Sequence, residues 1–166
     1  MTADQIKQHL GLVAHPEGGF YIQSYKSKEM IARDALNPRY PSARSTGTAI
    51  YYLLEPGTFS EMHRLKSDEI FHFYLGDPVE QLQLWPDGSS QIALIGPDLE
   101  RGHTLQLVVP KNVWQGAHLA PGGSFALLGC TVAPGFEFDD YESGGRESLT
   151  RQYPSRRDLI SALTRR

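Results

Sequence analysis

The sequence contains little cysteine and no excess of positive charge. Cys130 is the single cysteine among 166 residues, which excludes an intrachain disulfide. Because it lies in the apolar run 125–132, we expect a small buried side chain rather than a reactive thiolate. The formal net charge is −3 and the isoelectric point is near 6.0. This balance offers no basic surface to nucleic acid or to an anionic membrane, so we expect neither partner.

Long apolar runs are also missing. No stretch approaches the roughly 20 apolar residues of a membrane span. Residues 1–12 lack the basic block and the following apolar block of a signal peptide, so we expect a cytoplasmic protein. Hydrophobic residues make up 40% of the chain and charged residues 21%, as in globular proteins. At this length we expect one domain that spans residues 1–166.

Short segments rich in β-branched and aromatic residues recur through the middle of the chain. Turn residues separate them, and the sequence Pro-Asp-Gly-Ser at 86–89 predicts a β-hairpin between two of them. Many short strands without intervening helices predict an all-β antiparallel sandwich or barrel. The expected strands cover residues 49–54, 70–75, 81–85, 90–95, 104–109 and 124–132.

A short helix is expected at each end of the chain. Thr2 and Gln5 form a capping-box pattern, which predicts a helix within residues 1–12. A similar start followed by an apolar stripe predicts a helix within residues 155–166.

Two long segments have charges and little periodicity, residues 26–45 and 138–153. We expect each to be a surface loop or an arm with a strand at its end. Segments of that length usually cover a site or an interface, so both are candidates for lids or dimer contacts. Arg44, in the first segment, is a candidate to meet an anionic substrate at the rim of a site, although solvation is commoner for a lone arginine. Glu17 precedes two glycines that suit a tight turn, and it is a candidate to reach into the same site.

The most specific pattern is formed by Gly57, His63, Glu69 and Gly76, which are separated by five, five and six residues. This spacing matches the first signature of the cupin superfamily, whose motif spans a strand, a polar turn and a second strand. The signature normally has another histidine two residues after the first, where this chain has Leu65. A leucine can face a barrel interior but cannot bind a metal, so the fold prediction is stronger than the metal prediction.

The chain as a whole resembles the fifth cupin family, which is labelled domain of unknown function 985. The resemblance implies a cupin double-stranded β-helix, or jelly-roll barrel, with short terminal helices and a homodimeric assembly, and it brings no established substrate. Edge strands of the sheets are the expected dimer contacts. The resemblance rests on residues 15–21, 50–54, 63–69, 113–115 and 132–136.

Alternation along the strands predicts which side chains face the interior. If Glu69 points inward, Phe71 and Phe73 do so too, whereas His72 and Tyr74 point outward. An inward Gln115 in a later strand replaces the ligand histidine of the second cupin signature. The inner wall is then apolar with a few polar groups, as in a site for a small molecule.

A metal site is one interpretation of these groups. His63, Glu69 and Gln115 are the only candidate ligands we identify, and an amide is a poor one. The set falls short of the two histidines and one carboxylate that bind non-haem iron, and of the three strong ligands of catalytic zinc. We therefore expect no bound metal, or a weakly bound divalent cation.

General base catalysis is the preferred interpretation. A histidine beside a carboxylate can accept a proton at neutral pH, so we expect His63 to be the base and Glu69 to orient it. This arrangement is similar to the metal-free deoxysugar epimerases of the same superfold, whose acid is a tyrosine. Tyr52, Tyr74 and Tyr141 are candidates for that role, which stays unassigned.

Three functions follow from these interpretations. The first is an isomerase or epimerase that acts on a small polar or carbohydrate-derived substrate. The alternatives are a module that binds a small ligand without chemistry and a metal-dependent cupin enzyme. The candidate substrate-binding residues are Gln115, Tyr52, Phe71, Phe73, Arg44 and Glu17.

Overall fold

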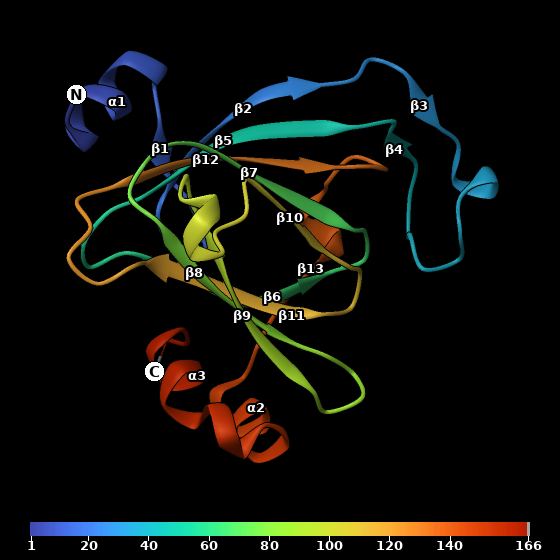
Figure 1. Ribbon diagram of the computed structural model, residues 1–166. Helices are drawn as coiled ribbons and strands as arrows, with labels where there is room; N and C mark the ends of the chain where they lie inside the picture. The colour runs from blue at the N-terminus through green and yellow to red at the C-terminus, as the bar shows by residue number, and fades with distance from the viewer. Residues whose placement is uncertain (166) are drawn as a thin grey trace.

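The computed structural model describes residues 1–165 and consists mainly of two antiparallel sheets (Figure 1). The first sheet has the order β1 (Val13–Ala14), β2 (Phe20–Lys26), β5 (Thr48–Leu54), β12 (Ala126–Val132), β7 (Glu69–Gly76) and β10 (Gln106–Val109). The second has the order β13 (Tyr141–Ser143), β6 (Phe59–Leu65), β11 (Trp114–Leu119), β8 (Val79–Leu84) and β9 (Ser90–Ile95). β3 (Met30–Ile31) and β4 (Arg44–Ser45) form a separate pair. The jelly-roll prediction is confirmed.

The turn residues form the connections that the sequence predicts. β8 and β9 pair from Val79 opposite Ile95 to Leu84 opposite Ser90, so the hairpin closes over residues 85–89. Gly88 in this turn has a φ of 89°, a conformation in which a side chain would be strained.

The helix prediction is correct at the N-terminus and incomplete at the C-terminus. In α1 (Ala3–Leu10), both capping-box hydrogen bonds between Thr2 and Gln5 are present. The expected helix over 155–166 is instead the 3₁₀ turn η4 (Pro154–Arg156) followed by α3 (Arg157–Ala162), and its end at Arg166 lies outside the described residues.

The segment 138–153 has more regular structure than a loop or an arm with one strand, and in this respect the prediction is wrong. It contains the 3₁₀ turn η3 (Phe138–Asp140), strand β13 and α2 (Arg146–Gln152). Leu149 and Tyr153 are each 2% exposed, and this apolar pair is too short to give a recognisable helical period. The segment 26–45 begins at the last residue of β2, contains β3 and the 3₁₀ turn η1 (Arg33–Ala35), and ends in β4, which agrees with the prediction of an arm with a strand at its end.

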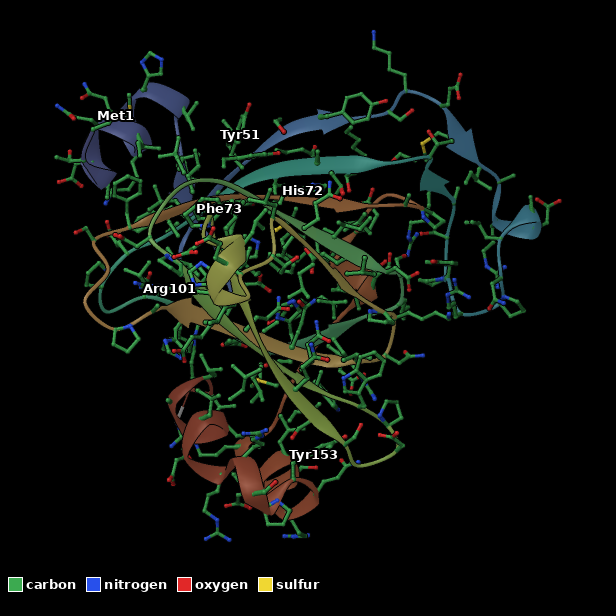
Figure 2. All side chains as sticks on the ribbon, in the orientation of Figure 1. Met1, Tyr51, His72, Phe73, Arg101 and Tyr153 are labelled. Atoms are coloured by element: carbon green, nitrogen blue, oxygen red, sulfur yellow. The ribbon has the colours of Figure 1, made fainter. Side chains whose placement is uncertain are left out.

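The helices cover the outer faces of the sheets (Figure 1). α2 and α3 pack on the second sheet, where Tyr153 lies below the strands and donates to the carbonyl of Trp85 at 2.7 Å (Figure 2). α1 packs on the first sheet through Ile6, against Leu53 and Leu127. None of the helices within residues 1–165 is both long and apolar enough to cross a membrane.

The barrel interior contains the main core, and alternation along β7 places its side chains as predicted. Phe71 is 2% exposed in this core, and Phe73 packs against it. His72 instead bonds Thr131 and Gln106, and Tyr74 is 48% exposed. The core fills one part of the barrel with Tyr52, Leu54, Phe71, Val79, Ile95, Val109, Val113, Ala117, Leu119, Ala126, Leu128 and Cys130.

A buried ion pair joins the arm 26–45 to the second sheet. Arg44 is fully buried, and its Nε and Nη2 atoms donate to the two carboxylate oxygens of Asp140 at 2.7 Å each. The expectation of a solvated or substrate-binding Arg44 is therefore wrong, because its charge is matched by a residue 96 positions away. The pair fixes the start of β13, which follows Asp140 directly.

We expect Arg44→Met to lower the free energy of unfolding by about 3–5 kcal/mol, because it leaves the Asp140 carboxylate buried without a partner. Chemical denaturation monitored by circular dichroism measures this loss. The matched control is Arg64→Met, which breaks the exposed pair between Arg64 and Glu142 on neighbouring strands. That change should cost about 1 kcal/mol or less, and equal losses would contradict the role of Arg44.

Candidate functional site

A cavity of about 190 Å³ lies inside the barrel beside the packed core. Its walls are mostly apolar and its polar groups come from both sheets and from the turn before β2. No lysine or arginine lines it among residues 1–165. The lining residues are His15, Glu17, Tyr21, Gln23, Thr48, Ile50, His63, Leu65, Glu69, Cys130, Val132, Phe136, Phe138 and Tyr141.

His63 lies on β6 and is 2% exposed. Its Nδ1 atom is 2.8 Å from the carbonyl oxygen of Glu61. A carbonyl can only accept, so Nδ1 carries the proton of the neutral ring and Nε2 has a free lone pair. Nε2 has no hydrogen-bond partner within residues 1–165. In this part of the chain, every side-chain nitrogen that lacks a partner is at least partly exposed. Nε2 is therefore accessible from the cavity.

Tyr141 holds the ring of His63 from one side. The two rings stack with centroids 5.0 Å apart and an interplanar angle of 21°. Tyr141 starts β13, which pairs with β6 and is fixed by the Arg44–Asp140 pair. Its hydroxyl donates to the carboxylate of Glu61 at 3.2 Å. This hydrogen bond and the pairing of β13 with β6 together hold the Tyr141 ring against the ring of His63.

The turn before β2 supplies His15 and Glu17. The backbone N–H of Glu17 donates to Nδ1 of His15 at 3.1 Å, and its carbonyl accepts from the backbone N–H of Glu61 at 3.0 Å. Gly18 has a φ of 108°, and a Cβ there would lie 2.0 Å from the carbonyl oxygen of Phe59. Glycine is therefore required for this turn to approach β6 closely.

The Glu17 carboxyl group lies between two imidazole rings. Its Oε2 is 3.4 Å from Nδ1 of His63, and its Oε1 is 3.7 Å from Nδ1 of His15. The candidate role of Glu17 in the site is consistent with this position on the cavity wall.

Glu69 is connected to a chain of buried amides. Nε2 of Gln115 donates to Oε2 of Glu69 at 2.7 Å, and Nε2 of Gln81 donates to Oε1 of Gln115 at 3.2 Å. Nε2 of Gln83 is shared between Oε1 of Gln81 at 3.2 Å and the carbonyl of Val108 at 3.4 Å. The side-chain amide of Gln115 is thus hydrogen-bonded to both Glu69 and Gln81.

Burial shifts the pKa values of the two glutamates and two histidines of the cavity so that their neutral forms are favoured. It raises the pKa of Glu17 to about 8, with help from Glu61, and that of Glu69 to about 7. It lowers the pKa of His15 to about 4 and also lowers the pKa of His63. At neutral pH the cavity therefore contains neutral imidazoles, a protonated Glu17 and a Glu69 near its midpoint.

The structure brings the predicted site residues His63, Glu69 and Glu17 to the cavity wall, together with the candidate acid Tyr141. The expected orientation of His63 by Glu69 is wrong, because the carbonyl of Glu61 makes that hydrogen bond. Sequence reasoning missed His15 and Glu61 as site residues. The signal for His15 was the short spacing to Glu17 and the paired glycines. Glu61 bonds to His63 through its backbone carbonyl, which every residue has, so its residue type could not indicate this bond.

The other predicted residues lie outside the cavity wall. Gln115 lies behind Glu69, and the hydroxyl of Tyr52 donates to the carbonyl of Gly18 at 2.7 Å. Phe71 and Phe73 belong to the packed core, so the prediction that they bind substrate is not supported by their positions. Tyr74 faces outward, which leaves Tyr141 as the one candidate tyrosine at the cavity.

The donor set does not fit the metal that the fold family implies. Leu65 occupies the position of the second histidine and Gln115 that of a later one, and the amide of Gln115 is already bonded at both ends. No group of three or more His, Cys, Asp or Glu side chains within residues 1–165 is arranged to hold a metal ion. His63 and Glu69 alone provide two ligands, fewer than a tight site needs.

Comparisons with known proteins agree with this architecture. The family described as cupin superfamily (DUF985) matches residues 4–144. The uncharacterized protein YML079W of Saccharomyces cerevisiae is 28% identical over 138 residues, which cover 78% of this chain and 69% of that protein. The resemblance inferred from the sequence is confirmed.

Solved structures extend the similarity to the complete fold. A hypothetical protein from Leishmania major has a TM-score of 0.89 and 30% identity over 100% of both chains. Protein SO0799 from Shewanella oneidensis has a TM-score of 0.87 and 36% identity over 99% of this chain and 98% of that one. Oxalate decarboxylase from Bacillus subtilis has a TM-score of 0.53 and 14% identity over 90% of this chain and 36% of that one; this similarity shows the fold alone.

We expect the double substitution Leu65→His with Gln115→His to create a metal site, because it adds two imidazoles beside His63 and Glu69. The variant should retain a stoichiometric divalent ion after dialysis against zinc or cobalt, measured by elemental analysis and by the cobalt absorption spectrum. The unmodified protein, treated in the same way, should not. Stoichiometric metal in the unmodified protein would show that our ligand set is incomplete.

We expect Glu17→Gln to gain stability relative to the unmodified protein as the pH rises. Folding raises the pKa of Glu17 from 4.5 to about 8, so the protonated carboxyl favours the folded state below about pH 4.5, and this contribution is lost as the pH rises through about 8. The variant has no such loss. Its free energy of unfolding minus that of the unmodified protein should therefore increase by a few kcal/mol between about pH 5 and pH 9. Denaturation at both pH values measures it. The control is Gln23→Ala, which replaces a residue that does not titrate on the same cavity wall. It should change the free energy of unfolding by the same amount at both pH values.

Proposed function

This chain belongs to the DUF985 family of the cupin superfamily, and from that premise we propose that its cavity binds a small polar molecule and catalyses proton transfer on it. His63 is the general base. The reaction class is an isomerisation or epimerisation, and no metal takes part. A carbohydrate-derived compound is a suitable substrate because the cavity combines apolar walls with several hydrogen-bonding groups.

The hydrogen bond between His63 and Glu61 is the observation that carries the proposal. It holds the proton on Nδ1 and leaves Nε2 as an acceptor toward the cavity. Burial lowers the pKa of His63, so the ring is neutral and ready to accept a proton at physiological pH. The stacked Tyr141 limits rotation of the ring, and a fixed geometry of this kind is what proton abstraction requires.

Glu69 and Glu17 provide the complementary acids. The raised pKa values, about 7 and about 8, keep a large fraction of both carboxyls protonated at neutral pH. A group with a pKa close to the working pH can both donate and accept a proton. Gln115 fixes the orientation of Glu69 through a 2.7 Å hydrogen bond.

The second candidate function is ligand binding without chemistry. One observation favours it: the candidate acids Tyr52 and Tyr141 do not offer a free proton. The hydroxyl of Tyr52 donates to the carbonyl of Gly18, and that of Tyr141 donates to Glu61. If neither Glu69 nor Glu17 acts as the acid in place of a tyrosine, the polar groups of the cavity bind a ligand and no reaction follows.

The homodimer also belongs to the proposal. β1 and β13 each lie at one end of a sheet and have one paired neighbour, so a second copy can pair with such an edge. Sedimentation equilibrium measures the assembly.

We expect His63→Gln to abolish substrate-dependent exchange of carbon-bound protons with D₂O, with a loss of about 10²–10⁴-fold because the base is removed. Proton NMR measures the exchange on a panel of free reducing sugars and a nucleotide-linked keto sugar. His72→Gln, on the outward face of β7, is the matched control and should keep full activity. Binding to the unmodified protein without exchange, detected by calorimetry, would favour the binding module instead.

A further inference from the structure

The cavity contains two histidines whose hydrogen bonds select opposite tautomers. Nδ1 of His15 accepts the backbone N–H of Glu17 at 3.1 Å, so in the neutral ring of His15 the proton is on Nε2. Nδ1 of His63 faces the carbonyl of Glu61 at 2.8 Å and carries the proton itself. Nε2 is therefore a donor in His15 and an acceptor in His63.

Both Nε2 atoms are available to a ligand. Neither atom has a hydrogen-bond partner within residues 1–165. Every side-chain nitrogen there that lacks a partner is at least partly exposed. Both rings line the same cavity. The cavity thus offers one neutral donor and one neutral acceptor, each on a fixed ring. His15 is held by its bond to Glu17 and by edge contacts with Tyr21 and Tyr52, at centroid distances of 4.3 and 5.8 Å.

We propose that His15 is a second catalytic residue, and that the substrate is an uncharged carbonyl compound with an acidic C–H next to the carbonyl. In this arrangement Nε2–H of His15 bonds the carbonyl oxygen while Nε2 of His63 accepts the proton from the adjacent carbon. The inference rests on the proposed function, because it assigns a partner to the base His63. It adds the substrate class and the group that stabilises the developing negative charge.

The charges around the cavity favour an uncharged substrate. No lysine or arginine lines the cavity among residues 1–165. The two arginines that approach this region are already paired, Arg44 with Asp140 and Arg165 with Glu61. A phosphate or carboxylate would therefore be desolvated beside Glu17 and Glu69 without a cationic partner, at a large energetic cost. A hydroxycarbonyl compound avoids this cost.

The reaction balances without an oxidant or a metal. The C–H bond next to the carbonyl breaks, its proton moves to Nε2 of His63, and its electron pair forms a C=C bond. The carbonyl π electrons move to the oxygen, which accepts the hydrogen bond from His15. Return of the proton from His63 to the same carbon regenerates the substrate. Its return to the former carbonyl carbon gives the isomer when the proton of the adjacent hydroxyl moves to the enolate oxygen, which becomes the new hydroxyl. Burial lowers the pKa of His15 to about 4, so its ring stays neutral, and a neutral imidazole can polarise a carbonyl in this way.

The test compares two pairs of probes that differ in charge. The uncharged pair is dihydroxyacetone and D-glyceraldehyde, and the anionic pair is their monophosphates. Proton NMR in D₂O measures exchange at the carbon next to the carbonyl, with spontaneous exchange subtracted. We expect catalysed exchange with the uncharged pair only. Exchange of the phosphates alone would overturn the substrate class and leave His63 as a base.

Substitution of His15 tests its role. His15→Phe keeps an aromatic ring beside Tyr21 and should lower kcat about 10²–10³-fold, the usual effect of losing an oxyanion donor, with little change in KM. His15→Gln keeps an N–H near the position of Nε2 and should recover part of the rate. His9→Gln, on the exposed face of α1, is the control and should keep full activity. Circular dichroism checks that each variant folds.

A spectroscopic measurement gives a result that does not depend on turnover. Two-dimensional ¹⁵N NMR of the histidine rings should show the proton on Nε2 of His15 and on Nδ1 of His63. The same tautomer in both rings would overturn the donor–acceptor pair. If His63→Gln loses exchange and His15→Phe keeps it, the role of His15 fails and the proposed function stands. Absence of exchange with all four probes overturns the substrate class, and the wider sugar panel then decides the proposed function separately.

Discussion

The site depends on Glu61, which bonds to three of the segments that meet around His63. Its backbone N–H donates to the carbonyl of Glu17, and its own carbonyl accepts from Nδ1 of His63. Its carboxylate accepts from the hydroxyls of Tyr141 and Ser143 and pairs with Arg165 at 2.8 Å. One residue therefore connects β6 to the turn before β2, to β13 and to the C-terminal segment. The tautomer of His63 follows from this network.

The division of the barrel into a packed part and a hollow part determines the chemistry. Aliphatic and aromatic side chains fill the packed part, whereas two histidines and two glutamates line the hollow part. Burial disfavours charge on each of them, and the shifts of Glu17 and His15 are the clearest examples. Leu65 and Gln115 stand where the fold family has two ligand histidines, so the groups that remain fit the proposed proton transfer better than a metal site.

The sequence predicted the features that depend on local rules. The turn at 86–89, the capping box at Thr2 and the inward direction of Glu69 follow from residue type and from alternation, and all three agree with the structure. Features that depend on distant partners could not be predicted. Arg44 is buried because Asp140, 96 residues away, matches its charge, and the proton position of His63 is set by a backbone carbonyl that every residue has.

The contacts around the cavity also determine when it can form during folding. Arg165 donates to the carbonyl of Pro16 across 149 residues, and Tyr141 reaches Glu61 across 80. Contacts of such high sequence separation require large loops to close first and are therefore slow to form. The strand pairs that close the barrel must be in register before these segments can meet. We therefore expect the cavity to form late in folding, and partially folded chains to contain the sheets without the cavity.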